Sequence, residues 1–182
     1  VRYQVGPPPN YDKSEWNNVK ETLSYDFPNL PYLQIEKVDG ENGTSVVRLT
    51  QMHAIMYYLG ENFHMLGKTA DEKARVIMII EAGRDWINSL FDVTYCNAPW
   101  YKDNEDGVHV SGNKQCTITS PKFEAMKEEY LSKTLKTYAN RFVQLLNKRS
   151  DNLRWIANTI EPTIADYILF EYIDQHYILC PK

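Results

Sequence analysis

The chain has 182 residues, of which 43% are hydrophobic and 24% are charged. This balance is typical of a folded protein with a buried core, and it excludes a chain that is disordered, collagen-like or coiled-coil throughout. The formal net charge is −4 and no block of lysine and arginine stands out. We therefore do not expect a nucleic-acid-binding protein that depends on phosphate attraction.

The cysteine pattern and the hydropathy predict a cytoplasmic protein without a membrane span. The cysteines Cys96, Cys116 and Cys180 are widely spaced and odd in number, which favours neither a disulfide framework nor a paired zinc motif. No apolar run approaches the roughly 20 residues of a membrane-spanning helix, and the first residues lack the regions of a signal peptide. The histidines show no metal-ligand spacing with cysteines or acidic residues, so no metal site is expected.

The first part of the chain predicts a small α/β region. Pro28 and Pro31 interrupt an apolar stretch and restrict the residues before them to extended backbone. The turn-rich segment 39–43 separates two strand-like runs, and apolar residues three and four positions apart follow Thr50. The predicted elements are a helix, two strands and a second helix: 12–23, 32–36, 45–49 and 50–60.

The second part, from residue 69, has a helical pattern. Thr69 and Glu72 form a capping box before a long apolar face. Pro121 suits the first turn of the next helix. Thr163 and Asp166 form a second capping signal, in which aspartate replaces the usual glutamate. The predicted helices are 71–95, 120–147 and 164–177.

Several segments of the chain resemble the cytosolic glutathione transferases, and the nearest class is mu, with its mite and other invertebrate relatives. In chain order they are Tyr11–Trp16, Asp26–Leu33, Leu49–Gln51 with Ala54-Ile55, Asp71–Lys73 and Thr163–Asp166. The run Asp-Phe-Pro-Asn-Leu-Pro-Tyr-Leu is highly specific. The last segment resembles the capping box of the family's central helix and is moderately specific.

The resemblance implies an α+β thioredoxin-like domain followed by an all-α helical bundle, which is the glutathione transferase fold. We expect these domains at 1–66 and 69–182, joined by Gly67-Lys68. On the family's plan the first strand and helix are absent and the chain stops before the last helices, so we interpret it as an internal fragment. The thiol-activating tyrosine is expected upstream, and no residue of this chain is assigned as catalytic.

The implied function is that of a homodimeric enzyme, which conjugates the thiolate of glutathione to electrophilic hydrophobic small molecules in detoxification. Glutathione is a co-substrate, and no further cofactor is expected. The alternative is a non-catalytic glutathione-binding or structural protein on the same fold. Met52 and the insertions at 34–48 and 102–119 favour this alternative, whereas the retained site residues favour the enzyme.

The family pattern assigns one side of a glutathione site to Asn29, Leu30 and Pro31. A cis peptide bond before Pro31 would turn the backbone of Leu30 outward, where it could pair with the cysteinyl unit of glutathione. Asn29 is expected to add a side-chain contact. The alternative is that Pro31 merely ends a loop.

The two ends of glutathione are assigned to other residues. Gln51 and Met52 begin a helix whose exposed amides favour the γ-glutamyl carboxylate, although the family has serine or threonine where Met52 stands. Trp16 and Lys20 match the positions that hold the glycyl carboxylate. Taken alone, Lys20 would be a solvated helix charge, and Trp16 could equally cover the core.

Three more residues match family positions. Asp85 corresponds to an acid that reaches the γ-glutamyl amine in the neighbouring subunit, and Phe27 to an aromatic key that enters the partner's helical domain. Tyr95 corresponds to a tyrosine that faces the electrophile. Alternatively, Asp85 is a surface charge, Phe27 belongs to the core of its own domain, and Tyr95 is a helix-end aromatic packed on the core. Tyr57 replaces an arginine that supports the mu-class dimer interface.

Overall fold

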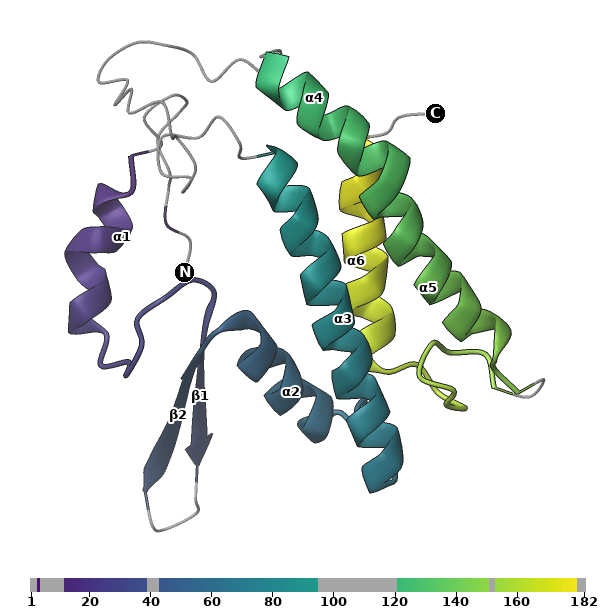
Figure 1. The fold of residues 1–182 in the computed structure, drawn as a ribbon. Coiled ribbons are helices and arrows are strands. Elements are labelled where there is room, and N and C mark those ends of the chain that lie inside the picture. The colour runs from purple at the N-terminus through teal and green to yellow at the C-terminus, as the bar shows by residue number, and fades with distance from the viewer. Residues whose placement is uncertain (1–2, 4–11, 39–42, 95–120, 151–152, 180–182) are drawn as a thin grey trace. The chain divides into compact units, whose positions relative to one another are not determined.

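The computed structural model describes residues 3, 12–38, 43–94, 121–150 and 153–179 (Figure 1). The chain divides into two compact units, Val1–Phe63 and His64–Lys182, and each is described by itself. Cys96, Cys116, Cys180, Tyr95 and the predicted insertion at 102–119 lie outside the described residues.

The first unit contains a helix, a two-stranded antiparallel sheet and a second helix. The elements are α1 Ser14–Val19, the 3₁₀ helix η1 Lys20–Thr22, β1 Tyr32–Val38, β2 Thr44–Thr50 and α2 Met52–Asn62. The Asp12 carboxylate accepts hydrogen bonds from the amide and the hydroxyl of Ser14, at 2.9 and 3.0 Å, just before α1. The helix predicted at 12–23 is therefore shorter than expected and tightens into a 3₁₀ turn over its last residues.

The sheet has a half-buried face. Leu33 lies opposite Leu49 and Ile35 lies opposite Val47, and all four side chains are half-buried. Because side chains alternate along a strand, these cross-strand pairs share one face and stabilise the hairpin. In α2, Ile55 and Gly60 are buried. Both predicted strands and the predicted helix are present, with ends that shift by one or two residues.

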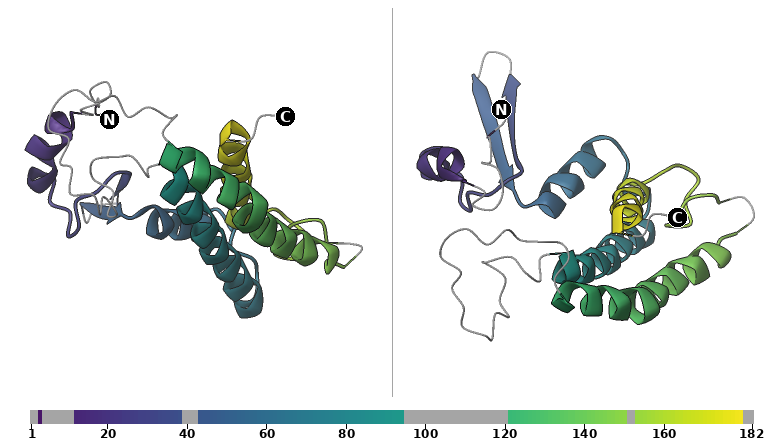
Figure 2. Two further views of the ribbon diagram at one scale, coloured as in Figure 1. Left: turned by 45° about the horizontal axis from the view of Figure 1, so that its top comes forward. Right: turned by 90° about the horizontal axis from the view of Figure 1, so that it is seen from above.

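The second unit is helical. Its elements are α3 Ala70–Thr94, α4 Pro121–Glu129, the π-helix η3 Tyr130–Thr134, α5 Leu135–Asn147 and α6 Ile164–Leu179. α6 lies against α3 in all three ribbon views, and α4 and η3 also contact α3 (Figures 1 and 2). The core between them is formed by fully or nearly fully buried apolar side chains: Val76, Ile79, Ile80, Ile87, Leu90, Ile164 and Ala165.

The helix predicted at 120–147 is interrupted by a π-turn. Its wider turn at 130–134 shifts the buried face by about one residue, because each hydrogen bond spans one residue more than in an α-helix. Tyr130, at the start of this turn, is 3% exposed. Tyr130 in the π-turn and Phe142 in α5 are both buried.

Both predicted helix caps are present. Thr69 Oγ1 accepts the Glu72 amide at 3.1 Å, and Glu72 Oε2 accepts the amides of Lys68 and Thr69 at 2.5 and 3.1 Å. These bonds lower the pKa of the Glu72 carboxyl. At α6, Asp166 accepts the amide and hydroxyl of Thr163 at 2.8 and 2.9 Å. The capping box of α3 is therefore confirmed, and at α6 the Asp166 carboxylate caps Thr163 as expected.

The residues that follow α2, from His64 onward, group with the helical unit. The Ile164 amide donates to the Met65 carbonyl at 2.9 Å, and Leu66 is 7% exposed. His64, Met65 and Leu66 therefore belong to the compact helical unit, where this hydrogen bond ties them to the start of α6. Sequence periodicity carries no signal for such a contact, since Met65 and Ile164 are far apart in the chain.

Candidate functional site

The hairpin register brings two separate segments to one end of the sheet. Tyr32 lies opposite Thr50, so Leu30 and Pro31, which precede β1, and Gln51, which follows β2, lie at the same end. The peptide bond between Leu30 and Pro31 is cis, which confirms that expectation. Leu30 is 42% exposed, and its backbone is therefore within reach of a ligand.

The amide of Leu30 already has a partner. Asn29 Oδ1 accepts this N–H at 2.9 Å, and both residues are exposed. The sequence predicted separate ligand contacts for the two residues, whereas the structure joins them in one hydrogen bond. A peptide that pairs with Leu30 must therefore replace the Asn29 bond, which frees the Asn29 side chain to make a contact of its own.

Gln51 has an uncommon backbone conformation at the start of α2. Its φ of 68° and ψ of 114° lie outside the regions that side chains prefer, and its carbonyl accepts the Ile55 amide at 3.1 Å. Its side chain makes no capping bond to the first turn of α2. This helix end therefore retains the partial positive charge that favours an anion. The adjacent Met52 side chain is 42% exposed.

Trp16 and Lys20 lie four residues apart on consecutive helical turns. The Lys20 amide donates to the Trp16 carbonyl, which continues α1 into η1. Residues at this spacing share one helix face. Both side chains are half-buried, so neither is a freely solvated surface group, and the indole N–H and the ammonium group could both be offered to one carboxylate.

Sequence reasoning missed an aromatic cluster around Trp16. The cluster consists of Tyr3, Trp16, Tyr25 and Tyr32. Trp16 stacks on Tyr32 with ring centroids 6.2 Å apart and planes at 16°, and Tyr3 meets the Trp16 ring edge-on at 5.1 Å. Tyr25 meets Tyr32 at 5.1 Å. The four residues show no common sequence period, and only the position of Tyr32 directly after Pro31 could have drawn attention to it.

Two tyrosines of this cluster, Tyr3 and Tyr25, have raised pKa values. The hydroxyls of Tyr3 and Tyr32 lie 3.3 Å apart, and this hydrogen bond, together with desolvation, raises the pKa of Tyr3 to about 12. Burial raises the pKa of Tyr25. A phenol with a raised pKa is a poor base at pH 7, so Tyr3 and Tyr25 are suited to shape this region rather than to remove protons.

Two predicted residues are exposed in their own units. Phe27 is 73% exposed, and it therefore does not belong to the core of the first unit, which was its alternative. Asp85 is exposed on α3, and the neighbouring Arg84 pairs with Glu81 at 2.5 Å. Both side chains are available for contact with another molecule.

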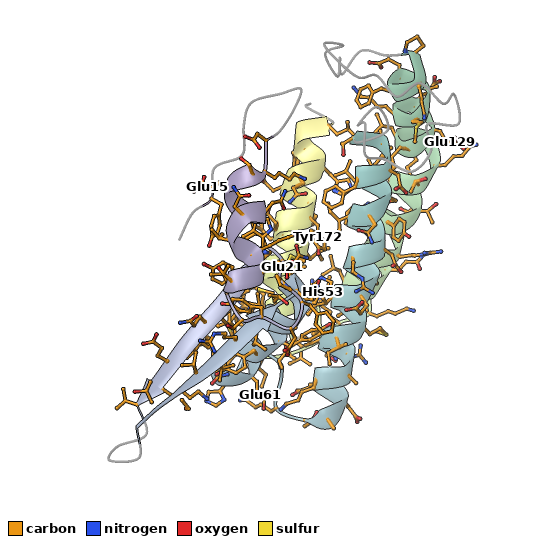
Figure 3. All side chains as sticks on the ribbon, turned by 90° about the vertical axis from the view of Figure 1, so that its left-hand side faces the viewer. Glu15, Glu21, His53, Glu61, Glu129 and Tyr172 are labelled. Atoms are coloured by element: carbon orange, nitrogen blue, oxygen red, sulfur yellow. The ribbon has the colours of Figure 1, made fainter. Side chains whose placement is uncertain are left out.

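Close packing of α3 against α6 fixes the α3 segment that carries Asp85. A Cβ atom at Gly83 would lie 3.2 Å from two ring carbons of Tyr172, and Figure 3 shows Tyr172 on α6 beside α3. A side chain at residue 83 would therefore press on the Tyr172 ring, which would have to move by a few tenths of an ångström. This packing leaves Asp85, two residues further on, on an exposed face of a rigid helix.

Within the described part of the chain, no cluster of three or more histidine, cysteine or acidic residues could hold a metal ion. Among the same residues, no helix is both long and apolar enough to cross a membrane.

The sequence was compared with known proteins. No family model matches it. The chain is 33% identical over 181 residues to glutathione S-transferase Mu 1 of Macaca fascicularis and 32% identical over 181 residues to human glutathione S-transferase Mu 4. Each alignment covers 100% of this chain and 65% of the relative. The chain thus spans about two thirds of the length of these relatives.

Solved structures show the same fold. The Onchocerca volvulus Pi-class glutathione S-transferase superposes with a TM-score of 0.65 at 24% identity, over 93% of this chain and 64% of that one. The glutathione S-transferase Blo t 8 superposes with a TM-score of 0.67 at 24% identity, over 98% and 64%. These structures show the fold, a thioredoxin-like domain followed by a helical domain. The sequence similarity along the whole of this chain shows that it belongs to the glutathione S-transferase family.

Proposed function

We propose that the protein containing this chain is a mu-class-like glutathione transferase. In the reaction the thiol of glutathione loses its proton, and the sulfur forms a bond to an electrophilic carbon of a hydrophobic molecule, with loss of a leaving group or addition to a double bond. The relatives named glutathione S-transferase Mu, at 32–33% identity, support this assignment.

The observation that carries the proposal is the hairpin register, in which Tyr32 lies opposite Thr50. It brings the exposed backbone of Leu30 next to the start of α2, so an extended peptide could pair with Leu30 while its terminal carboxylate meets the first turn of α2. Glutathione has this combination of an extended backbone and a carboxylate. Gln51 and Met52 would receive the γ-glutamyl carboxylate, Met52 through its backbone amide alone.

The other end of glutathione carries the glycyl carboxylate. Trp16 would donate its indole N–H and Lys20 would supply a charge-assisted hydrogen bond. Asn29, once released from Leu30, would contact the ligand from the middle. The exposed Phe27 and Asp85 would meet a second copy of the chain in a cytoplasmic homodimer, where Asp85 binds the γ-glutamyl amine of the partner's ligand. Tyr95 would face the electrophile.

The test is retention on immobilised glutathione and conjugation of a chloronitrobenzene by the full-length protein. We expect retention and turnover from the wild type, and loss of retention for Gln51→Ala, because the γ-glutamyl carboxylate loses its polar contact. The matched control is Gln34→Ala, which removes an exposed glutamine from the same hairpin.

The outcomes separate the possible functions. Retention without turnover would identify a non-catalytic glutathione-binding protein, the alternative that Met52 favours. Absence of both would refute each assignment. Equal retention of the wild type and Gln51→Ala would show that the anion site lies elsewhere.

A further inference from the structure

Tyr32 is the centre of the aromatic cluster. Its ring stacks on Trp16, lies 5.1 Å from the ring of Tyr25 and 6.4 Å from the ring of Tyr3. Tyr25 is 9% exposed, so the Tyr32 ring contacts a buried ring on one side and the half-buried Trp16 on another. Offset stacked and tilted pairs at these distances attract one another. Tyr32 therefore connects Trp16 to the interior of the first unit.

The backbone of Tyr32 connects the other parts of the proposed glutathione site. It is the first residue of β1, it follows Pro31 directly, and it pairs with Thr50, the residue before Gln51. The segment with Leu30, the start of α2 and the Trp16 ring thus all adjoin this single residue.

The α1–η1 segment contains no buried residue. Its α-helical part, α1, is only six residues long. Short helices in water depend on tertiary packing, and for α1 the described packing is the stack of Trp16 on Tyr32 and the edge contact with Tyr3. The orientation of the indole therefore depends on these two rings.

We propose that Tyr32 is a positioning residue for glutathione, which holds the Trp16 indole and the following Lys20 at the distance from Leu30 and Gln51 that the tripeptide spans. This inference rests on the proposed function. Tyr32 does not itself touch the reacting atoms. Its ring is the essential part, whereas its hydroxyl serves only the contact with Tyr3.

The test compares three variants of the full-length protein. Tyr32→Leu removes the ring, Tyr32→Phe keeps the ring and removes the hydroxyl, and Tyr58→Leu removes a half-buried ring from α2 that lies outside the cluster. The first readout needs no ligand. Each tryptophan gives one indole N–H signal in a ¹⁵N spectrum, and the signal that is lost in Trp16→Phe is that of Trp16. We expect Tyr32→Leu to displace this signal, and Tyr58→Leu to leave it in place.

The second readout is catalysis at a temperature where every variant is folded. A displaced indole loses its hydrogen bond to the glycyl carboxylate, and the loss of one such bond to a charged acceptor should weaken binding roughly tenfold. We expect Tyr32→Leu to raise KM for glutathione by about this factor, with kcat and KM for the electrophile within about twofold of the wild type. Tyr32→Phe and Tyr58→Leu should each have the KM for glutathione of the wild type.

Each negative outcome has a distinct meaning. An unmoved Trp16 signal in Tyr32→Leu, or an unchanged KM for glutathione, overturns the positioning role. An equal rise of KM in Tyr58→Leu also overturns it, because the effect would then reflect general packing. If the wild type neither retains nor conjugates glutathione, the proposed function fails, whereas the indole signals still decide whether Tyr32 holds Trp16.

Discussion

The interiors of the two units of this chain are packed differently. In the helical unit, Val76 and Ile80 of α3 are 0% and 1% exposed, and Ile164 of α6 is 2% exposed. In the first unit, the most buried apolar side chains among the described residues are Ile55 at 8% and Tyr25 at 9%. The first unit thus relies on a hairpin and a cluster of rings near its surface rather than on a deep core.

This difference agrees with the location of the proposed ligand site in the first unit. The proposed ligand groups of the first unit must be accessible, and Leu30 and Met52 are each 42% exposed. Segments with few buried contacts open at a smaller free-energy cost than a packed core. We therefore expect the helical unit to set the stability of the chain and the first unit to gain order when glutathione binds.

The largest expected effect comes from the core of the helical unit. Ile80→Ala should lower the free energy of unfolding by about 4 kcal/mol, because it leaves a cavity in a fully packed site. Ile35→Ala, on the half-buried face of β1, should cost only about 1 kcal/mol. Urea unfolding of both variants measures the contrast, and equal losses would show that the first unit has a core as effective as that of the second.

The cap of α6 is expected to have the next largest effect. The carboxylate of Asp166 accepts the amide and hydroxyl of Thr163 and, at 2.8 Å, the amide of Ile156. Asp166→Ala leaves these donors without a partner and should cost about 3 kcal/mol in unfolding free energy. The control is Asp174→Ala, an exposed position on the same helix. A loss below about 1 kcal/mol would mean that water replaces the carboxylate.

A buried histidine should make the helical unit sensitive to acid. His176 Nδ1 donates to the Tyr172 carbonyl and Nε2 accepts from the Tyr130 hydroxyl, each at 2.5 Å, while the Trp86 ring lies at 4.4 Å. Burial lowers the pKa of His176 below 6.5, and the bond to the Tyr172 carbonyl opposes this shift only in part. Below pH 6.5, His176 therefore binds a proton more readily in the unfolded chain than in the folded chain.

Stability from this group is therefore complete above pH 6.5 and is lost as the pH falls, by at most about 1.4 kcal/mol per pH unit. Urea unfolding between pH 7.5 and 5.5 measures the slope. The slope of the unfolding free energy against pH should disappear in His176→Gln. It should remain in the control His64→Asn, which changes an exposed histidine at φ 57°. An unchanged slope in His176→Gln would assign the effect to other groups.

Features set by neighbouring residues could be predicted from the sequence. The caps at Thr69 and Thr163 and the strands around the turn at 39–43 depend on local patterns, and the structure has them. The π-turn at 130–134 was not predicted. Its first residue, Tyr130, is hydrogen-bonded to His176, 46 residues away in the chain. A helical period cannot report such a contact.

The candidate site divides in the same way. The cis bond before Pro31 was expected from a specific motif, and it is present. The Tyr32 cluster was not expected, because its rings come from positions as distant as Tyr3 and have no shared spacing. The bond between Asn29 and the Leu30 amide also escaped prediction, since both groups were assigned to a ligand.

The smallest expected change in stability distinguishes structure from function within the first unit. Gln51 has a φ of 68° and a ψ of 114°, a conformation that costs a side-chain-bearing residue about 1–3 kcal/mol and that glycine adopts readily. Gln51→Gly should therefore stabilise the chain by about 0.5 kcal/mol, after the greater freedom of glycine in the unfolded state is subtracted, while it abolishes retention on glutathione. Ser24→Gly, at an exposed residue with φ 57°, should stabilise to a similar degree and leave retention intact. If Gln51→Gly instead destabilised the chain, Gln51 would be holding the fold, and its strained backbone could not be ascribed to ligand binding. If both results hold, the conformation of Gln51 lowers the stability of the chain and serves the proposed anion site at the start of α2 rather than the fold.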